Sequence, residues 1–120
     1  MKRDADLMRA LLLAVEASPH GYIHGNPAVP GYDDETVAYH AFLMDEAGLV
    51  EARITKTLSS PSPTAVIVRL TSAGHDFLDV ARDDARWKRA VKAAAGVFSI
   101  PILKDLLEKL LRGELGLPDG

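Results

Sequence analysis

An α+β fold is predicted by two kinds of hydrophobic periodicity in the chain. Apolar residues recur at helical spacing in residues 4–17, in residues 34–47 and again from Ser99 onward. Residues 49–58 alternate apolar with polar side chains, and a short β-branched run follows at residues 65–70, as is typical of strands. The polar, proline-rich sequence between these two strands predicts the exposed tip of a single β-hairpin.

The first helix is predicted over residues 4–17, followed by a short strand and a loop. Apolar residues recur three and four positions apart, and a Ser-Pro pair ends the helix. Residues 20–32 hold three glycines and two prolines, which are too many for a helix. Only Tyr22 and Ile23 offer a short strand there.

Residues 34–47 predict a second helix that runs directly into the hairpin. Asp33 or Asp34 is suited to cap its start, and Gly48 follows its last residue, where a left-handed backbone is favoured. This order of elements is that of a winged-helix domain with the hairpin as the wing. Because residues 20–32 occupy the place of the usual second helix, the helix-turn-helix unit is predicted to be degenerate.

Further helices are predicted after the hairpin. Thr71 is suited to cap the first of them, and Asp83 can cap its continuation. The last helix carries a leucine stripe that must dock on the domain or on a second copy. Three of its residues are expected to be mostly buried: Leu103, Leu107 and Leu110. The predicted organisation is a winged-helix-like domain over residues 1–96 and a C-terminal helix and tail over residues 97–120.

Composition excludes several functional classes. The 120 residues include no cysteine, which excludes a disulfide framework, a thiolate zinc site and a Cys nucleophile. The hydrophobic fraction of 48% and the charged fraction of 26% are ordinary for one globular domain. The formal net charge of −3 creates no overall attraction for a nucleic acid. No apolar run has the length of a signal-peptide core or a membrane span, so a cytoplasmic location without a membrane partner is expected.

The helix at residues 34–47 provides the first candidate binding surface. Its inner face is predicted to contribute the core set Val37, Ala41, Met44, Ala47 and Leu49. Where DNA readers place basic or polar side chains, it carries the candidate partner-binding residues Ala38, Tyr39, Phe42 and Leu43. Its ends bring five acidic residues and no Lys or Arg, so a phosphate backbone would repel it. Coverage of this face within the monomer and docking of a protein partner or second subunit both remain open.

Basic residues gather in two places and form a candidate nucleic-acid surface. Three lie on the predicted hairpin: Arg53, Lys56 and Arg69. Five lie within eleven residues: Arg82, Arg86, Lys88, Arg89 and Lys92. Acidic residues three or four positions before them allow intrahelical ion pairs, which are the simpler interpretation of the second set. Trp87 in the same segment is interpreted as a core anchor.

No catalytic or metal site is predicted. His20 and His24 lie about 13 Å apart in an extended segment at roughly 3.3 Å per residue, too far to share one metal ion. His75 and Asp79 are one helical turn apart, which favours a surface hydrogen bond over acid–base chemistry. His40 is expected at the boundary between two apolar faces, with a satisfied ring nitrogen. We therefore expect no catalytic residue, no metal, no cofactor and no small-molecule substrate.

Several short motifs resemble one bacterial and phage family. The sequences "MKRD", "AYH", "EAGLVEA", "LTSAGHDFLD" and "RDDARW" are similar to the family catalogued as domain of unknown function 2513. The resemblance covers residues 1 to about 90. It implies a winged-helix-like fold and proteins often found near prophages and other mobile elements, and it implies no established activity. The "LTxxGxxxL" pattern beginning at Leu70 also resembles the strand-to-helix junction after the wing in several repressor groups.

The expected function is binding and not chemistry. The leading hypothesis is a non-enzymatic protein-interaction module that regulates or inhibits a mobile element. The alternative is a DNA-binding transcriptional regulator that uses the wing and the Arg82–Lys92 patch. A basic stripe continuous from Arg53 to Lys92 in the folded protein would favour the alternative.

Overall fold

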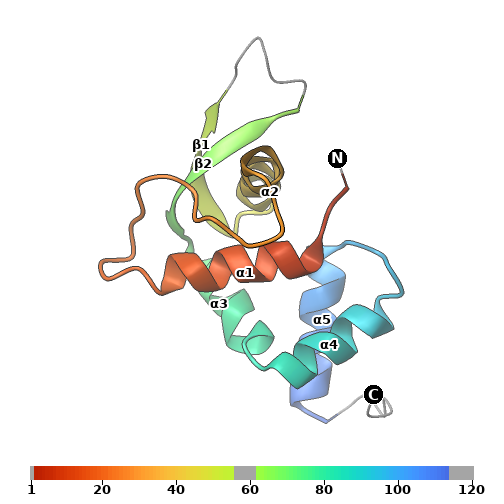
Figure 1. The fold of residues 1–120 in the computed structure, drawn as a ribbon. Helices are drawn as coiled ribbons and strands as arrows, with labels where there is room; N and C mark the ends of the chain where they lie inside the picture. The colour runs from red at the N-terminus through yellow and green to blue at the C-terminus, as the bar shows by residue number, and fades with distance from the viewer. Residues whose placement is uncertain (1, 56–61, 114–120) are drawn as a thin grey trace. The chain divides into compact units, whose positions relative to one another are not determined.

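The computed structural model describes residues 2–55 and 62–113, which form five helices and two strands (Figure 1). In chain order the elements are α1 (Ala5–Glu16), α2 (Asp34–Glu46), β1 (Val50–Thr55), β2 (Thr64–Leu70), α3 (Ser72–Ala81), α4 (Asp84–Ala93) and α5 (Ile100–Leu111). The predicted α+β class is therefore confirmed. The chain divides into two compact units, Met1–His75 and Asp76–Gly120, and the division falls inside α3. The sequence-based boundary between residues 96 and 97 stays a prediction.

Helix α1 begins at a side-chain cap and buries one apolar face. Asp4 Oδ1 accepts a hydrogen bond from Leu7 N over 3.1 Å, which satisfies a backbone donor of the first turn. Five residues at helical spacing are buried: Leu7, Met8, Leu11, Leu12 and Val15. The helix predicted over residues 4–17 is confirmed to within one residue at each end.

The segment between α1 and α2 contains no helix, as its glycines and prolines predicted. Tyr22 forms an isolated antiparallel bridge with Arg69 of β2. Ile23 N donates to Val68 O over 3.0 Å. The short strand predicted at these two residues is therefore reduced to a single bridge on the outer edge of β2.

The Asn26 side chain extends this contact along β2. Its Nδ2 donates to Ala65 O, and its Oδ1 accepts from Ile67 N, each over 2.9 Å. One amide side chain thereby satisfies a backbone acceptor and a backbone donor that a third strand would otherwise pair.

Strands β1 and β2 form an antiparallel hairpin with one irregularity in its register. Ala52 pairs with Ile67, whereas the residue before it pairs with Arg69, so β2 carries an extra residue at Val68. Such a bulge bends the strand and increases its local twist. Residues 59–61 of the predicted hairpin tip lie outside the described residues.

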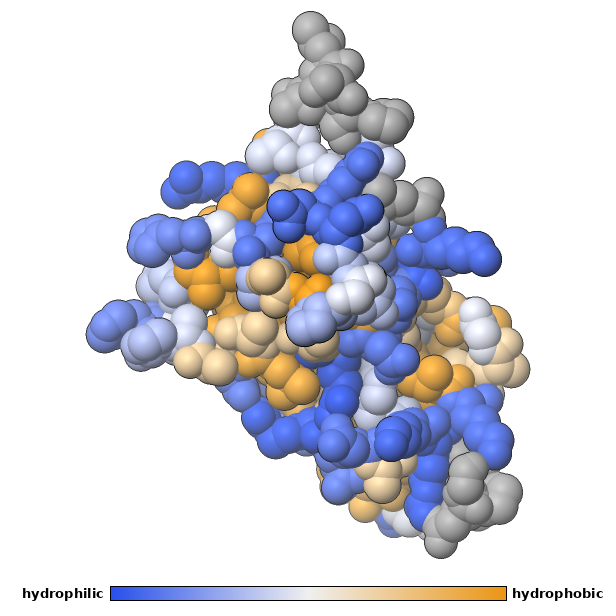
Figure 2. Space-filling view, viewed as in Figure 1, coloured by the Kyte–Doolittle hydropathy of each residue, from blue (hydrophilic) through white to orange (hydrophobic). Residues whose placement is uncertain are grey.

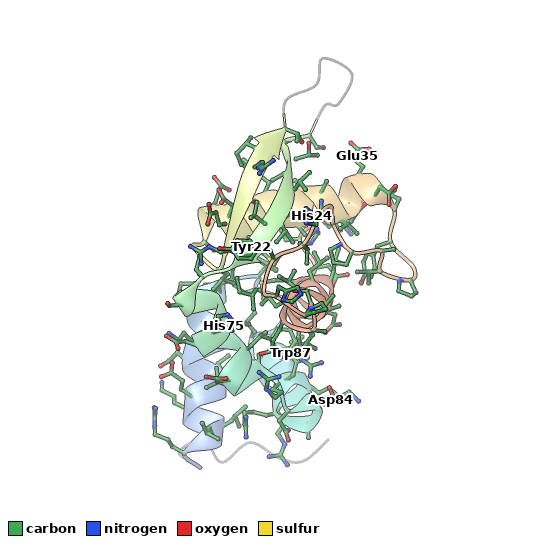
Figure 3. All side chains as sticks on the ribbon, turned by 90° about the vertical axis from the view of Figure 1, so that its left-hand side faces the viewer. Tyr22, His24, Glu35, His75, Asp84 and Trp87 are labelled. Atoms are coloured by element: carbon green, nitrogen blue, oxygen red, sulfur yellow. The ribbon has the colours of Figure 1, made fainter. Side chains whose placement is uncertain are left out.

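Helix α2 packs against α1 and both strands (Figures 1 and 3). Asp33 Oδ1 caps it by accepting from Thr36 N over 2.7 Å, and Gly48 follows it with a φ of 78°, as predicted. Four of its residues are buried: Val37, His40, Ala41 and Met44. The prediction for Ala47 was wrong, because this residue is the C-cap, where the chain leaves the helix, and its side chain is exposed.

The "LTxxGxxxL" pattern forms a close contact between the end of β2, the start of α3 and the turn after α2. Thr71 Oγ1 donates to Gly48 O and accepts from Gly74 N over 3.1 Å, so Thr71 caps α3 as predicted. Thr71 N donates to Leu49 O over 3.0 Å. A Cβ atom on Gly74 would collide with Leu49 O, so only glycine fits this position.

In the second unit, α4 packs against α5. The Asp83 side chain caps α4 and the Ser99 side chain caps α5, each by accepting a backbone N–H of the first turn. The rings of Phe77 and Trp87 meet edge to face with centroids 6.3 Å apart. Trp87 is 2% exposed, which confirms it as a core anchor.

The leucines of α5 follow the predicted pattern with one exception. Leu103 and Leu107 are buried, as expected. Leu110 is half-buried and not mostly buried, because it lies in the last turn, one residue before the helix ends. Within residues 2–55 and 62–113, no helix is long and apolar enough to cross a bilayer.

Candidate protein-interaction surface

Helix α2 presents two opposite faces of different chemistry. Its inner face consists of the buried residues Val37, His40, Ala41 and Met44. At 3.6 residues per turn, the residues opposite this face have successive spacings of four, three and four: Glu35, Tyr39, Phe42 and Glu46. The two aromatic side chains are half-buried, the two carboxylates are exposed, and Figure 3 shows Glu35 near the start of the helix. We call these four residues the acidic–aromatic stripe.

The four residues predicted to bind a partner lie on and beside this stripe. Tyr39 and Phe42 form its centre, and helical spacing places Ala38 and Leu43 on its two flanks. All four side chains are half-buried, so each retains exposed area that the residues of the inner face lack. The helix therefore brings the predicted set together on one side, and its role in binding stays a prediction.

The charge of α2 is entirely acidic. Five carboxylates cap the helix or belong to it: Asp33, Asp34, Glu35, Asp45 and Glu46. Hydrogen bonds from Thr36 hold the pKa of Asp33 below its usual value. Asp45 Oδ1 accepts from Ala52 N over 3.0 Å, which ties this carboxylate to β1. The two carboxylates of the acidic–aromatic stripe project into solvent.

The inner face of α2 contains a buried histidine. His40 is 0% exposed, so its predicted position at the boundary between two faces was wrong. Its Nε2 accepts a hydrogen bond from Asp4 N over 2.7 Å, and its Nδ1 lies 2.9 Å from Thr36 O. Because one ring nitrogen must accept and the other must donate, this geometry assigns a neutral imidazole with its proton on Nδ1. The predicted satisfaction of a ring nitrogen is confirmed for both.

Asp4 connects this histidine to the loop before α2. Tyr32 Oη donates to Asp4 Oδ2 over 2.6 Å. Burial raises the pKa of Asp4, but the hydrogen bonds from Tyr32 and Leu7 outweigh it and leave this pKa below its usual value. The bond to Asp4, aided by burial, raises the pKa of Tyr32 to about 12. The start of α1, the loop and α2 are thus joined by one polar network.

The predicted basic residues of the hairpin are only partly described. Arg53 on β1 is exposed. Arg69 on β2 lies 2.7 Å from Glu51 and also donates from Nη1 to Leu70 O over 3.0 Å. Lys56 lies outside the described residues. A carboxylate therefore accompanies one of the two described cations.

The second basic set lies at the end of α3 and on α4. Arg82 is 3.8 Å from Asp79, as the intrahelical spacing predicted, and Arg86 Nη1 donates to Val80 O over 3.2 Å. The other three lie on α4: Lys88, Arg89 and Lys92. The hairpin belongs to the first unit and α4 to the second, so each set is described by itself. A stripe continuous across both sets stays a hypothesis.

The histidines outside α2 do not form a metal centre. His20, His24 and His75 are exposed, and Figure 3 shows the last two on separate segments of the chain. Among the described residues, no group of three or more His, Asp or Glu side chains could hold a metal ion.

Large apolar side chains are also exposed elsewhere. They are Tyr22, Ile54, Val97, Ile102 and Leu111. Figure 2 shows hydrophobic residues in groups interrupted by hydrophilic ones. Apolar residues make up a large part of any protein surface and do not by themselves indicate a site.

The sequence pattern predicted the aromatic pair of α2 as a surface but did not include Glu35 in it. The signal was present, since Glu35 lies four residues before Tyr39. The network of His40, Asp4 and Tyr32 left no comparable signal. Asp4 lies 28 residues from Tyr32 and 36 residues from His40 in the sequence, so no local periodicity connects them.

Comparison with known proteins gives a family without an assigned activity. Residues 2–97 match the family described as "Hypothetical protein (DUF2513)". The chain is also 34% identical over 115 residues to an uncharacterized protein of Haemophilus influenzae, an alignment that covers 92% of this chain and 96% of that protein. No solved structure matches the chain. The resemblance seen in the sequence motifs is confirmed, and the chain belongs to the DUF2513 family.

Proposed function

We propose that this protein acts by binding another protein chain through the acidic–aromatic stripe of α2. In this proposal it is a non-enzymatic regulator or inhibitor associated with a mobile element, and it needs no cofactor. The observation that carries the proposal is the position of Tyr39 and Phe42, which lie opposite the buried face of their helix. Aromatic side chains retained on an outward face are typical of interfaces, where they provide large contact areas.

The proposed fold is winged-helix-like, with α2 in the place of the recognition helix. The order α1, α2, β1, β2 supports this proposal, with a loop where a second helix would stand and the hairpin as the wing. A major-groove role for α2 is disfavoured by its charge, since Glu35 and Glu46 would face phosphates. The same carboxylates are compatible with a protein surface that carries basic residues.

The test is a pair of matched aspartate substitutions on the two faces of α2. Phe42→Asp places a carboxylate on the outward face, where it remains hydrated until a partner covers it. Met44→Asp places the same group among buried residues and is expected to destabilise the domain by more than about 3 kcal/mol. Thermal melts of both variants and of the unchanged protein separate these effects.

The binding measurement uses the full chain as bait in an extract of its native host, followed by mass spectrometry and titration of the captured protein. The expected result is a specific partner that Phe42→Asp fails to retain although its melting temperature falls far less than that of Met44→Asp. A collapsed melting temperature for Phe42→Asp would instead place this side chain in the core and overturn the proposal. Retention of every captured protein by the variant would also overturn it.

DNA binding is the second candidate function, and the exposed Lys88 and Lys92 of α4 favour it. In this alternative the Arg82–Lys92 patch and the hairpin residues Arg53, Lys56 and Arg69 contact phosphates. A net acidic chain gains little from counterion release, so we expect duplex DNA to bind no better than micromolar at about 0.15 M salt. Sequence-selective nanomolar binding in fluorescence anisotropy would favour the alternative.

A further inference from the structure

We propose that the chain which occupies the acidic–aromatic stripe is a second copy of this protein, and that it binds through the basic surface of its own α4. This inference rests on the proposed docking role of α2 and specifies the partner. If a two-fold axis relates the two copies, α2 of each copy meets α4 of the other and the contact occurs twice in one dimer.

The receiving surface has aromatic residues at its centre and a carboxylate at each end. Glu35 and Glu46 are eleven residues apart, which is roughly 16 Å along a helix at 1.5 Å per residue. Tyr39 and Phe42 lie between them. This arrangement fits a cationic segment, because a guanidinium or ammonium group can lie over an aromatic ring while its neighbours reach the carboxylates.

The outward face of α4 has the complementary chemistry. Its inner residues Trp87, Ala90 and Ala94 are buried, and helical spacing places four residues on the opposite side: Ala85, Lys88, Arg89 and Lys92. We call these the basic stripe. Ala85 and Lys92 are seven residues apart, which is roughly 10 Å along the helix, so the long side chains of the cations would have to extend along the helix direction to reach both carboxylates. The methyl group of Ala85 also permits close approach of another helix.

Charge segregation within the chain is the reason to choose a second copy as the occupant. Helix α2 contains four acidic residues and no Lys or Arg, whereas α4 contains four basic residues and one acidic residue. These two helices therefore carry formal charges of −4 and +3, although the whole chain has a net charge of only −3. The acidic–aromatic stripe itself carries two of the negative charges, and the basic stripe carries three positive charges. Opposite charges segregated in this way favour pairing of the two stripes and disfavour pairing of like stripes.

The test is a charge exchange between the two stripes, measured by sedimentation equilibrium over a hundredfold range of protein concentration. One variant carries Glu35→Lys with Glu46→Lys, and the other carries Lys88→Glu with Lys92→Glu. All four residues are exposed, so thermal melts of both variants are expected to match the unchanged protein at a protein concentration low enough for every sample to be monomeric. Asp76→Lys, at an exposed position of α3, is the control for a charge reversal outside either stripe.

The unchanged protein is expected to form a dimer whose dissociation constant rises with salt. Each double variant is expected to weaken that dimer at least tenfold, and Asp76→Lys to change it less than twofold. A mixture of the two double variants is expected to associate again. The lysine-bearing α2 of one then faces the glutamate-bearing α4 of the other, and the unchanged stripes also match.

A monomeric unchanged protein at every concentration would overturn the second copy as the occupant. The same holds for a dimer that neither double variant weakens, or for a mixture that fails to associate. These results can be separated from failure of the proposed function. If the protein is monomeric while a captured protein depends on Phe42, the docking role of α2 stands with a different partner. If Phe42→Asp changes no association at all, both proposals fail.

Discussion

Helices α1 and α2 are nearly equal in length and are both capped by an aspartate, yet they distribute their side chains in opposite ways. Helix α1 has twelve residues and α2 has thirteen, with Asp4 and Asp33 as their respective N-caps. Helix α1 buries five apolar side chains on one face. Helix α2 buries a histidine on its inner face and retains Tyr39 and Phe42 on its outer face.

This difference lies in the outward faces of the two helices, and the proposed binding role of α2 rests on it. Burying an imidazole requires partners for both ring nitrogens, which α2 obtains from a backbone N–H and a backbone carbonyl. Leaving aromatic side chains half-exposed sacrifices burial that would stabilise the fold. The hydrogen bonds of His40 contribute to stability, so only the half-exposed aromatic pair supports the proposed binding role of α2.

The largest effect is expected in the core face of α1. Leu11→Ala should lower the free energy of unfolding by about 2–5 kcal/mol, because it removes a fully buried side chain and leaves a cavity. Urea denaturation measures this loss. Ala5→Gly, at the start of the same helix, should have a smaller effect of about 1 kcal/mol or less. Equal effects of the two changes would contradict the assignment of this face as core.

The next largest loss of stability is expected for His40, the buried polar residue of α2. His40→Ala should cost about 3 kcal/mol, because it leaves Asp4 N without its acceptor and opens a cavity beneath α2. Urea denaturation of this variant is compared with that of His24→Ala, which changes an exposed histidine and should be neutral. Similar stabilities for the two variants would show that the hydrogen bonds of His40 contribute nothing.

Local signals in the sequence were enough to predict most elements of the fold. Helix caps at Asp33, Thr71 and Asp83 and the glycine after α2 are local features, and the structure has each of them. Burial at helix ends was predicted less well, as Ala47 and Leu110 show. Whether a residue in the last turn is buried depends on the path of the chain after the helix ends. Helical periodicity gives no information about that path.

The candidate site was also predicted only in part, because some of its features are local in the sequence and others depend on distant residues. The apolar outward face of α2 follows from helical spacing alone, so its four residues could be named without a structure. The burial of His40 could not, because it depends on Asp4, which lies 36 residues away in the sequence. Distant partners of this kind appear only once the chain is folded, and no motif indicated them.

Tyr32 allows the polar network to be tested through pH. Tyr32→Phe should lower the free energy of unfolding by about 1 kcal/mol near neutral pH, since it removes a hydrogen bond to a carboxylate. The folded pKa of Asp4 is lowered, so its contribution is present at neutral pH and is lost as pH falls through that pKa. The folded pKa of Tyr32 is raised to about 12 from 10.0, so its contribution is lost as pH rises between these values.

The measurement is urea denaturation of both proteins from acidic to strongly alkaline pH, and the difference between them is the quantity of interest. That difference should be largest between the two titrations and should shrink at both ends. Other titrating groups are common to both proteins and largely cancel in the difference. A difference that is constant with pH would show that the bond between Tyr32 and Asp4 is not formed in solution.

The smallest effect on stability, and the sharpest contrast between α1 and α2, is expected for Phe42. Phe42→Ala should lower the free energy of unfolding by less than about 1 kcal/mol, because this side chain is half-buried on the outward face and leaves no closed cavity. Met44→Ala removes a side chain two residues later on the buried face and should cost about 2–5 kcal/mol. Urea denaturation of the two variants gives the comparison directly. A loss for Phe42→Ala as large as that for Met44→Ala would mean that both faces of α2 belong to the core, and the helix would then resemble α1 after all. A small loss would show that Phe42 contributes little to the free energy of folding, which is what the proposed binding role of the outward face requires.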